Sequence, residues 1–197
     1  KIVMFGAEPY GNYNRILLSN VLNQSQCPEE IFLNPLTWYR ENGIFLYAGV
    51  KAVKIDTAHR CVVGYPLPAE VNTYDFSDGL FDRDAVVTEP YDNIIIATGS
   101  RPFVPPIEGH GLPGVFLFRT IDDCRRIAEF VHGCRKAAVI GGGLLGLEAA
   151  RGLLTHNVDV TVVEAGGQLM NVQLDEESGQ MLKRTMEAMG ITVVVNG

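Results

Sequence analysis

A glycine pattern in the last third of the chain constrains the fold more than any other feature. Residues 141–146 read Gly-Gly-Gly-Leu-Leu-Gly, which is the spacing G-x-G-x-x-G. An apolar run precedes the pattern at residues 137–140, and helically spaced apolar residues follow it. In such a strand–turn–helix unit Gly141 permits the tight turn, Gly143 leaves room for a pyrophosphate, and Gly146 lets the helix pack against the strand. The pattern therefore predicts a dinucleotide at the positive end of a helix.

The residues after the glycine pattern indicate which dinucleotide is bound. A second apolar run, residues 158–163, ends in Glu164, close to the offset of about 20 residues at which a carboxylate meets a ribose 2′-hydroxyl. That carboxylate would repel a 2′-phosphate, and residues 165–168 contain no Arg or Lys. We therefore predict NAD rather than NADP. A glycine-rich turn without a ligand is the alternative, but strand, turn, helix, strand and acid rarely coincide by chance.

Composition limits the classes of partner. The formal charge of −7 argues against nucleic acid and anionic membrane surfaces. The four cysteines show no C-x-x-C or Cys/His spacing, which disfavours a metal site, and so few in 197 residues disfavour a disulfide framework. No apolar run is long enough to span a membrane, and no signal-peptide pattern opens the chain. A reducing, cytoplasmic setting is expected.

The order of strand and helix patterns predicts an α/β fold in two parts. Strand patterns lie at residues 1–5, 46–55, 60–63, 93–97, 137–140, 158–163 and 193–195. Helical patterns lie at residues 16–22, 38–42, 121–131 and 147–154 and between Asp175 and Gly190. Thr120 and Asp123 have the spacing of a capping box. Proline-rich residues 102–113 read as a linker, so we place the domain boundary within residues 114–119.

Two further motifs resemble the flavoprotein reductases that bind two dinucleotides, FAD and NAD. Residues 97–102, Ala-Thr-Gly-Ser-Arg-Pro, resemble the A-T-G-S-x-P motif that lies against FAD in this family. Residues 12–19 resemble the P-Y-x-R-x-x-L-S motif of its rubredoxin-reductase and ferredoxin-reductase branch, in which Arg and Ser approach the FAD pyrophosphate. The resemblance implies further cofactor contacts by residues that match these motifs: Arg15, Ser19, Thr98, Gly99 and Pro102.

The same resemblance places two carboxylates and defines the fold. Glu8 stands where the family has its FAD ribose acid, and Glu148 stands beside the nicotinamide. We expect parts of two three-layer, Rossmann-like nucleotide-binding domains, both truncated: an FAD domain over residues 1–119 and an NAD domain over residues 120–197. The first strand and glycine loop of the FAD domain are absent from this sequence, which also begins and ends in strand patterns. A piece of a longer polypeptide, inactive alone, is therefore expected.

Departures from the family pattern are informative. Related reductases often carry Lys after the Leu-Ser pair, near the flavin, where this chain has Asn20. The C-x-x-x-x-C of the disulfide reductases is missing, so a dithiol relay is not expected. Whether a side chain at position 20 influences the flavin in this chain, as Lys does in related reductases, is therefore not predicted.

Within the branch, four segments resemble the large subunits of the assimilatory NAD(P)H-dependent nitrite reductases. They are residues 14–19, 34–39, 142–150 and 173–175. The resemblance implies that electrons pass from NADH through FAD to an iron–sulfur and sirohaem module outside this stretch, and it allows for a homodimer and a small subunit. Two alternatives stay open: a ferredoxin or rubredoxin reductase, and a non-catalytic NAD-binding sensor.

Other polar and sulfur-containing residues receive no functional assignment. The four histidines have no partner spacing, and no catalytic residue is assigned. Residues 64–89 read as a surface hairpin or loop, in which Asp78, Asp82 and Asp84 lack the spacing of a calcium loop and are expected to be solvated. Three methionines of the last helical pattern are expected to fill the core: Met181, Met186 and Met189.

Overall fold

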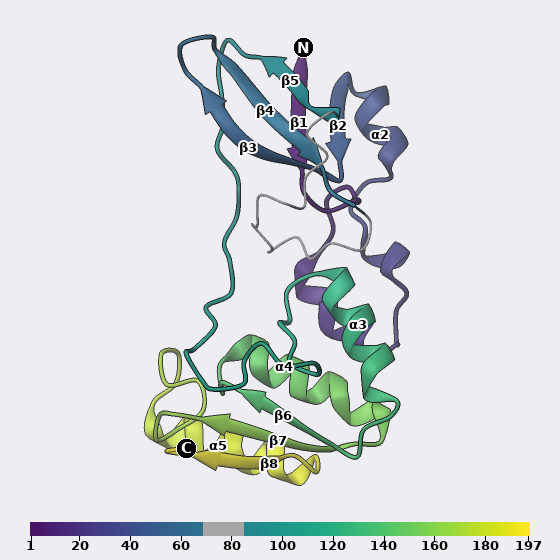
Figure 1. Cartoon of the computed structure of the whole chain (residues 1–197). Coiled ribbons are helices and arrows are strands. Elements are labelled where there is room, and N and C mark those ends of the chain that lie inside the picture. Colours follow the sequence, from purple (N-terminus) through teal and green to yellow (C-terminus); the bar gives the residue numbers. More distant parts are fainter. Residues whose placement is uncertain (69–84) are drawn as a thin grey trace. The chain divides into compact units, whose positions relative to one another are not determined.

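The computed structural model describes residues 1–68 and 85–197 and divides the chain into two compact units (Figure 1). The first unit consists of Lys1–Tyr13 and Phe32–Arg101, and the second of Asn14–Ile31 and Pro102–Gly197. The predictions for Asp78, Asp82, Asp84 and most of the loop across residues 64–89 lie outside the described residues.

The described residues of the first unit form two small sheets. Strands β1 (Ile2–Gly6) and β2 (Ile44–Ala48) pair in parallel, and helix α2 (Leu36–Glu41) precedes β2. Strands β3 (Val50–Asp56), β4 (Cys61–Pro66) and β5 (Val87–Pro90) form an antiparallel sheet in that order. The single strand predicted over residues 46–55 is two strands, because Gly49 between them adopts a left-handed φ of 76°.

The strand predicted at residues 93–97 is wrong for this structure. Residues 94–100 belong to no helix or strand, and the side chains of Ile95 and Ile96 are 91% and 68% exposed. A run of isoleucines favours a buried strand only where a neighbouring strand supplies hydrogen-bond partners and a second layer covers it. In the described residues no strand pairs with this run, so it remains extended chain.

The second unit is built on a parallel sheet with helical crossovers (Figure 1). Its strands run in the order β6 (Lys136–Ile140), β7 (Asp159–Glu164) and β8 (Thr192–Val195). Helix α4 (Leu144–Leu153) and the 3₁₀ turn η5 (Leu154–His156) connect the first pair, and α5 (Glu176–Ala188) connects the second. Parallel neighbours require such crossovers, and this arrangement confirms the predicted α/β class. Fully buried side chains between the layers include Val160, Val162, Leu169 and Ile191.

Helix ends in the second unit follow their predicted caps. Helix α3 (Ile121–Val131) begins with the predicted capping box: Asp123 N donates to Thr120 Oγ1 (3.1 Å), and Thr120 N donates to Asp123 Oδ2 (2.9 Å). Ser178 N donates to the Asp175 carboxylate at the start of α5 (2.8 Å). Gly190 follows the last helix with a φ of 94°.

Two details of the second unit differ from the sequence-based view. Met186 is buried, as predicted, but Met181 and Met189 are 65% and 48% exposed, because they lie on the outer side of α5 and just beyond its end. Segment Asn14–Ile31, which holds the 3₁₀ turn η1 (Arg15–Leu17), helix α1 (Leu18–Leu22) and the 3₁₀ turn η2 (Pro28–Ile31), packs with the second unit. The compact units therefore do not meet at the predicted domain boundary, residues 114–119. The division into an FAD domain and an NAD domain at that boundary stays a prediction.

Candidate functional site

In the glycine loop between β6 and α4, the backbone geometry itself requires glycine at two of the three consensus positions, Gly141 and Gly146. Gly141 has a φ of 107°, which side chains rarely adopt. A Cβ on Gly146 would lie 2.0 Å from the carbonyl oxygen of Gly141, so helix and turn meet too closely for any side chain. Gly143 differs: its φ is −82°, and a Cβ there would have no atom within 4 Å. The space beside Gly143 is therefore open.

Gly142 is a residue that the consensus spacing misses. Its N–H donates to Glu164 Oε2 (2.7 Å), and its carbonyl accepts from Met170 N (2.9 Å). A Cβ on Gly142 would lie 2.5 Å from the side chain of Leu169, which is fully buried. A side chain at this middle position would therefore force its neighbours to shift. In the sequence, the run of three consecutive glycines was the one sign that Gly142 also matters.

Glu164 ends β7 and is held in place by backbone groups. Oε2 accepts from Gly142 N, and Oε1 accepts from Gly166 N, both at 2.7 Å. An ionised carboxylate offers about four acceptor positions. Two therefore remain for a further donor such as a ribose hydroxyl. The structure thus brings Glu164 to the glycine loop, and its role as a ribose acid stays a prediction.

The surroundings of the loop combine apolar side chains with a partly buried acid. Ile140, Leu144 and Leu145 flank the glycines and are each more than half exposed. Glu148 lies one turn into α4, where partial burial raises the pKa of its carboxyl above the usual range. The first N–H groups of α4 have no acceptor within the helix and can meet an anion. Chemically, the loop suits a nucleotide diphosphate.

The second predicted ribose acid, Glu8, lies beyond the end of β1. The Tyr13 hydroxyl donates to Glu8 Oε2 (2.5 Å), and the Tyr13 side chain is buried. Tyr39 is also buried, and its hydroxyl oxygen accepts a hydrogen bond from Asn12 N in the adjacent loop (2.8 Å). Two tyrosine hydroxyls, rather than a glycine turn, therefore support this loop among the described residues.

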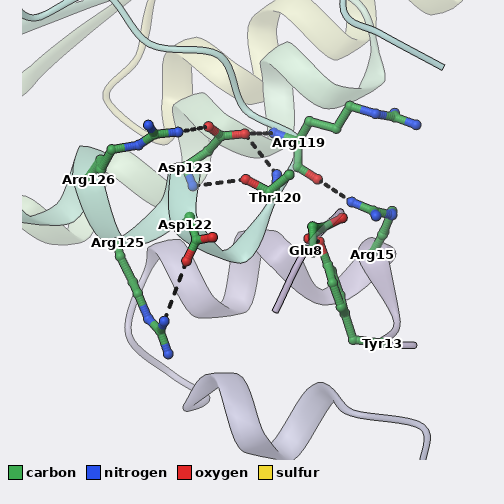
Figure 2. A network of polar contacts seen from close by, with 9 residues as sticks. All are labelled: Glu8, Tyr13, Arg15, Arg119, Thr120, Asp122, Asp123, Arg125 and Arg126. Atoms are coloured by element: carbon green, nitrogen blue, oxygen red, sulfur yellow. Dashed lines mark hydrogen bonds and ion pairs between the residues drawn. The ribbon is translucent and has the colours of Figure 1, made fainter. Parts of the chain in front are cut away.

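The remaining residues predicted to bind FAD are divided between the two units. Thr98 and Gly99 lie in the extended chain of the first unit, where Gly99 has a φ of 68°. Arg15, Ser19 and Pro102 belong to the second unit. Arg15 Nη1 donates to the carbonyl oxygen of Arg119 (2.9 Å), as Figure 2 shows. Assembly of these residues with Glu8 into one FAD site stays a prediction.

Each of the four histidines has a hydrogen-bond partner. His59 lies 3.1 Å from Asp56, while His110, His132 and His156 bond backbone carbonyls through one ring nitrogen. All four cysteines are free thiols, and burial raises the pKa of Cys124 to about 12. Within residues 1–68 and 85–197, no group of three or more metal-ligating side chains gathers. No helix of that described part is long and apolar enough to cross a bilayer.

Comparison with known proteins identifies relatives along the whole chain. The nitrite reductase [NAD(P)H] of Bacillus subtilis (strain 168) is 43% identical over 195 residues, which cover 99% of this chain but 22% of that protein. The nitrite reductase (NADH) large subunit of Escherichia coli (strain K12) is 33% identical over 192 residues, which cover 98% of this chain and 20% of that protein. The predicted resemblance to nitrite reductase large subunits is confirmed. The chain spans about a fifth of these relatives.

Solved structures show the same fold. The NAD-dependent persulfide reductase from A. fulgidus superposes on the chain with a TM-score of 0.82 at 24% identity, covering 100% of this chain and 35% of that one. The chain thus shares the fold of about a third of that protein. The family model described as pyridine nucleotide-disulphide oxidoreductase matches residues 1–197. This chain therefore belongs to the pyridine nucleotide-disulphide oxidoreductase family.

Proposed function

We propose that this chain forms the NADH-oxidising part of a flavoprotein nitrite reductase. Membership of the family implies FAD and a pyridine nucleotide as cofactors. When bound, the nicotinamide supplies a hydride, and the flavin accepts it and releases electrons singly. The chain's own contribution is to bind, orient and select these groups. The observation that carries the proposal is the Glu164 carboxylate, hydrogen-bonded to the glycine loop at the start of α4.

The residues of the second unit fit NADH. Gly143 leaves open space at the N-terminus of α4, where unpaired N–H groups and the helix dipole favour a diphosphate. Glu164 keeps acceptor positions for a ribose diol, and exposed Ala165 adds no positive charge for a 2′-phosphate. Glu148, one turn further along α4, is proposed to line the nicotinamide end of the site. These features support NADH over NADPH.

The residues proposed to hold FAD supply charge and backbone shape. Arg15 offers a guanidinium fork suited to a diphosphate, and Ser19 on α1 offers a hydroxyl. Glu8, held by Tyr13, is proposed to accept from the FAD ribose. Further contacts are assigned to the extended chain at Thr98, Gly99 and Pro102. No residue of this chain is proposed to exchange protons or form covalent bonds with substrate.

The rest of the electron path is proposed from the relatives. Nitrite reductases are similar to this chain over nearly its whole length, and a B. subtilis relative, 40% identical, is named as an electron transfer subunit of assimilatory nitrate reductase. We assign the next electron acceptor to an iron–sulfur and sirohaem module of the intact protein, with a homodimer and a small subunit as further partners. A cytoplasmic setting belongs to the same proposal.

Anaerobic titration of the intact protein tests this function. The visible flavin band is expected to bleach on addition of one NADH per flavin, with NADPH much less effective. Addition of nitrite is then expected to restore the band. Glu164→Ala is expected to raise the NADH concentration needed for half-bleaching, while Asp159→Asn, at the other end of the same strand, leaves it unchanged.

The other outcomes identify the two alternatives. Bleaching by NADH that a ferredoxin or rubredoxin reverses, while nitrite does not, would assign the chain to a ferredoxin or rubredoxin reductase. Binding of NADH by an intact protein that carries no flavin would point to a non-catalytic sensor. Either result would overturn the nitrite reductase proposal.

A further inference from the structure

A hydrogen bond ties Arg15 to the start of helix α3, about a hundred residues away in sequence. Arg15 Nη1 donates to the carbonyl oxygen of Arg119 (2.9 Å), and both residues belong to the second unit (Figure 2). The Arg15 side chain is exposed. A long exposed side chain normally samples many rotamers. The bond to the Arg119 carbonyl therefore reduces the number of rotamers open to Arg15.

The position of that carbonyl is itself determined by Asp123. The Asp123 side chain is buried, and its Oδ2 accepts from Arg119 N (3.0 Å) and Thr120 N (2.9 Å). Its Oδ1 accepts from Arg126 Nη2 (2.7 Å), which balances the buried charge. Figure 2 shows these bonds converging on one carboxylate. The two N–H groups belong to the peptide planes before and after the Arg119 Cα, and the second of these planes contains the Arg119 carbonyl, so Asp123 holds that carbonyl in place.

The segment that carries Arg15 is also held to the rest of the second unit at the end of α1. His156 Nε2 lies 2.7 Å from the carbonyl oxygen of Leu22, at the end of α1, and Thr155 Oγ1 donates to the next carbonyl, Asn23 (3.4 Å). Gly152 on α4 allows close packing, because a Cβ there would lie 2.9 Å from the Leu22 side chain. Segment Asn14–Ile31 is thus anchored at its beginning and along α1, and Arg15 is ordered with the helices of the second unit.

We propose that Asp123 is a positioning residue for Arg15, and through Arg15 for the diphosphate of FAD. The inference rests on the proposed function, because it takes Arg15 as a ligand of that diphosphate. A guanidinium has five N–H donors in a planar fork, so it can bond a backbone carbonyl and phosphate oxygens at the same time. Asp123 contributes by ordering Arg15 before the ligand arrives, which lowers the entropic cost of binding. Asp123 itself touches no ligand.

The test measures FAD affinity of the intact protein by flavin fluorescence after reversible removal of the cofactor. Asp123→Ala releases the backbone at Arg119, so FAD is expected to bind about threefold to tenfold more weakly, the range for one side chain that must be ordered on binding. Asp123→Asn keeps an oxygen for the two N–H groups and is expected to recover most of the affinity. Thr120→Ala is the matched control: it removes the other half of the capping box but keeps both carboxylate–backbone bonds.

A double-mutant cycle separates positioning from general destabilisation. Once Arg15→Ala has removed the guanidinium, adding Asp123→Ala is expected to weaken FAD binding no further, whereas a purely structural loss would weaken it equally in both backgrounds. Thermal unfolding of Thr120→Ala and Asp123→Ala measures the loss of the helix cap alone. If Thr120→Ala weakens FAD binding as much as Asp123→Ala does, or the two losses simply add, the positioning role is overturned.

The same measurements distinguish failure of the inference from failure of the proposed function. A wild-type protein that binds no flavin contradicts the proposed function itself. A wild-type protein that binds FAD, but for which Arg15→Ala has no effect, leaves the flavoprotein function standing and overturns the role of Arg15 and Asp123.

Discussion

Glu164 in the second unit and Glu8 in the first are carboxylates with the same predicted task but different supports. Glu164 accepts from two backbone N–H groups, Gly142 and Gly166, both at 2.7 Å. Glu8 accepts from the hydroxyl of buried Tyr13. One acid is therefore built into a glycine turn, whereas the other depends on a side chain five residues further along. The first arrangement is specified within a short stretch of sequence, and the second depends on how a loop folds.

This difference explains why one site was easier to predict. In the second unit, strand, glycine turn, helix, strand and acid follow one another within residues 136–164, so spacing alone indicated the loop and Glu164. In the first unit the candidate residues are separated by more than 80 positions, and only family motifs pointed to them. The role of Tyr13 in holding Glu8 could not be inferred, because nothing in its spacing distinguishes it from a core tyrosine.

Gly146→Ala should have the largest effect, because it tests the backbone of the glycine turn itself. The added Cβ would lie 2.0 Å from the Gly141 carbonyl oxygen, and backbone on both sides must shift. We expect a loss of at least about 3 kcal/mol in the free energy of unfolding, the upper part of the range for overpacked sites. Urea denaturation measures it. Gly143→Ala is the control, since a Cβ there meets nothing within 4 Å; equal losses would contradict the described turn.

Gly143→Val separates binding from folding. The valine side chain would fill the open space proposed for the pyrophosphate, while the backbone φ of −82° is one that valine tolerates. NADH affinity is expected to fall by more than about tenfold, equivalent to about 1.4 kcal/mol, with little change in thermal stability. Gly141→Val is expected to lower both NADH affinity and thermal stability, because the φ of Gly141 is 107°. Normal flavin reduction by NADH in Gly143→Val would mean that the loop does not hold the nucleotide.

Glu164→Ala combined with Ala165→Arg tests whether Glu164 makes the site prefer NADH over NADPH. Removing the carboxylate costs the ribose bond, about 1.5–3 kcal/mol for a bond to a charged group, and the arginine adds a partner for a 2′-phosphate. The ratio of kcat/KM for NADPH to that for NADH is expected to rise by at least about tenfold. Ala165→Gln, similar in length but neutral, is the control for the charge. An unchanged ratio would show that Glu164 does not contact the ribose.

Prediction from sequence failed where partners come from distant segments. The isoleucine run at residues 94–96 has the composition of a buried strand, yet strand pairing depends on a neighbour that local sequence does not specify. Gly142 was passed over because the consensus leaves that position free, although Leu169, 27 residues later, fills the space beside it. Caps were predicted correctly because Thr120 and Asp123 bond within one helical turn.

Tyr13→Phe tests the side-chain support of Glu8. Phenylalanine keeps the buried ring but removes the hydroxyl that donates to Glu8. FAD affinity of the intact protein is expected to fall about threefold to tenfold, in line with the net value of one ordinary hydrogen bond. Tyr10→Phe, which removes the hydroxyl of a less buried neighbour, is the matched control. If Tyr13→Phe and wild-type protein bind FAD equally well, Glu8 does not need this support or does not contact the flavin nucleotide.

Glu148→Gln should have the smallest effect of these substitutions. It is expected to raise the melting temperature, whereas the matching substitution at Glu164 is expected to lower it. Partial burial raises the pKa of Glu148 above its ordinary value of 4.5. The folded state therefore binds this proton more tightly than the unfolded state. The associated stability is fully present below the unfolded pKa and is lost as the pH rises through the folded pKa. Neutral glutamine removes that loss, so Glu148→Gln is expected to raise the melting temperature slightly at pH 7 and to leave it nearly unchanged at pH 4.

Glu164→Gln should instead lower the melting temperature at pH 7, because an amide group cannot accept from both Gly142 and Gly166 as the carboxylate does. Calorimetry of both variants and wild type at the two pH values, without nucleotide, measures the contrast. Each variant is compared with wild type at the same pH, so acid effects common to both proteins cancel. A lower melting temperature for Glu148→Gln at pH 7 would mean that the Glu148 carboxylate is stabilised by a donor. Burial would then not be the main influence on its charge.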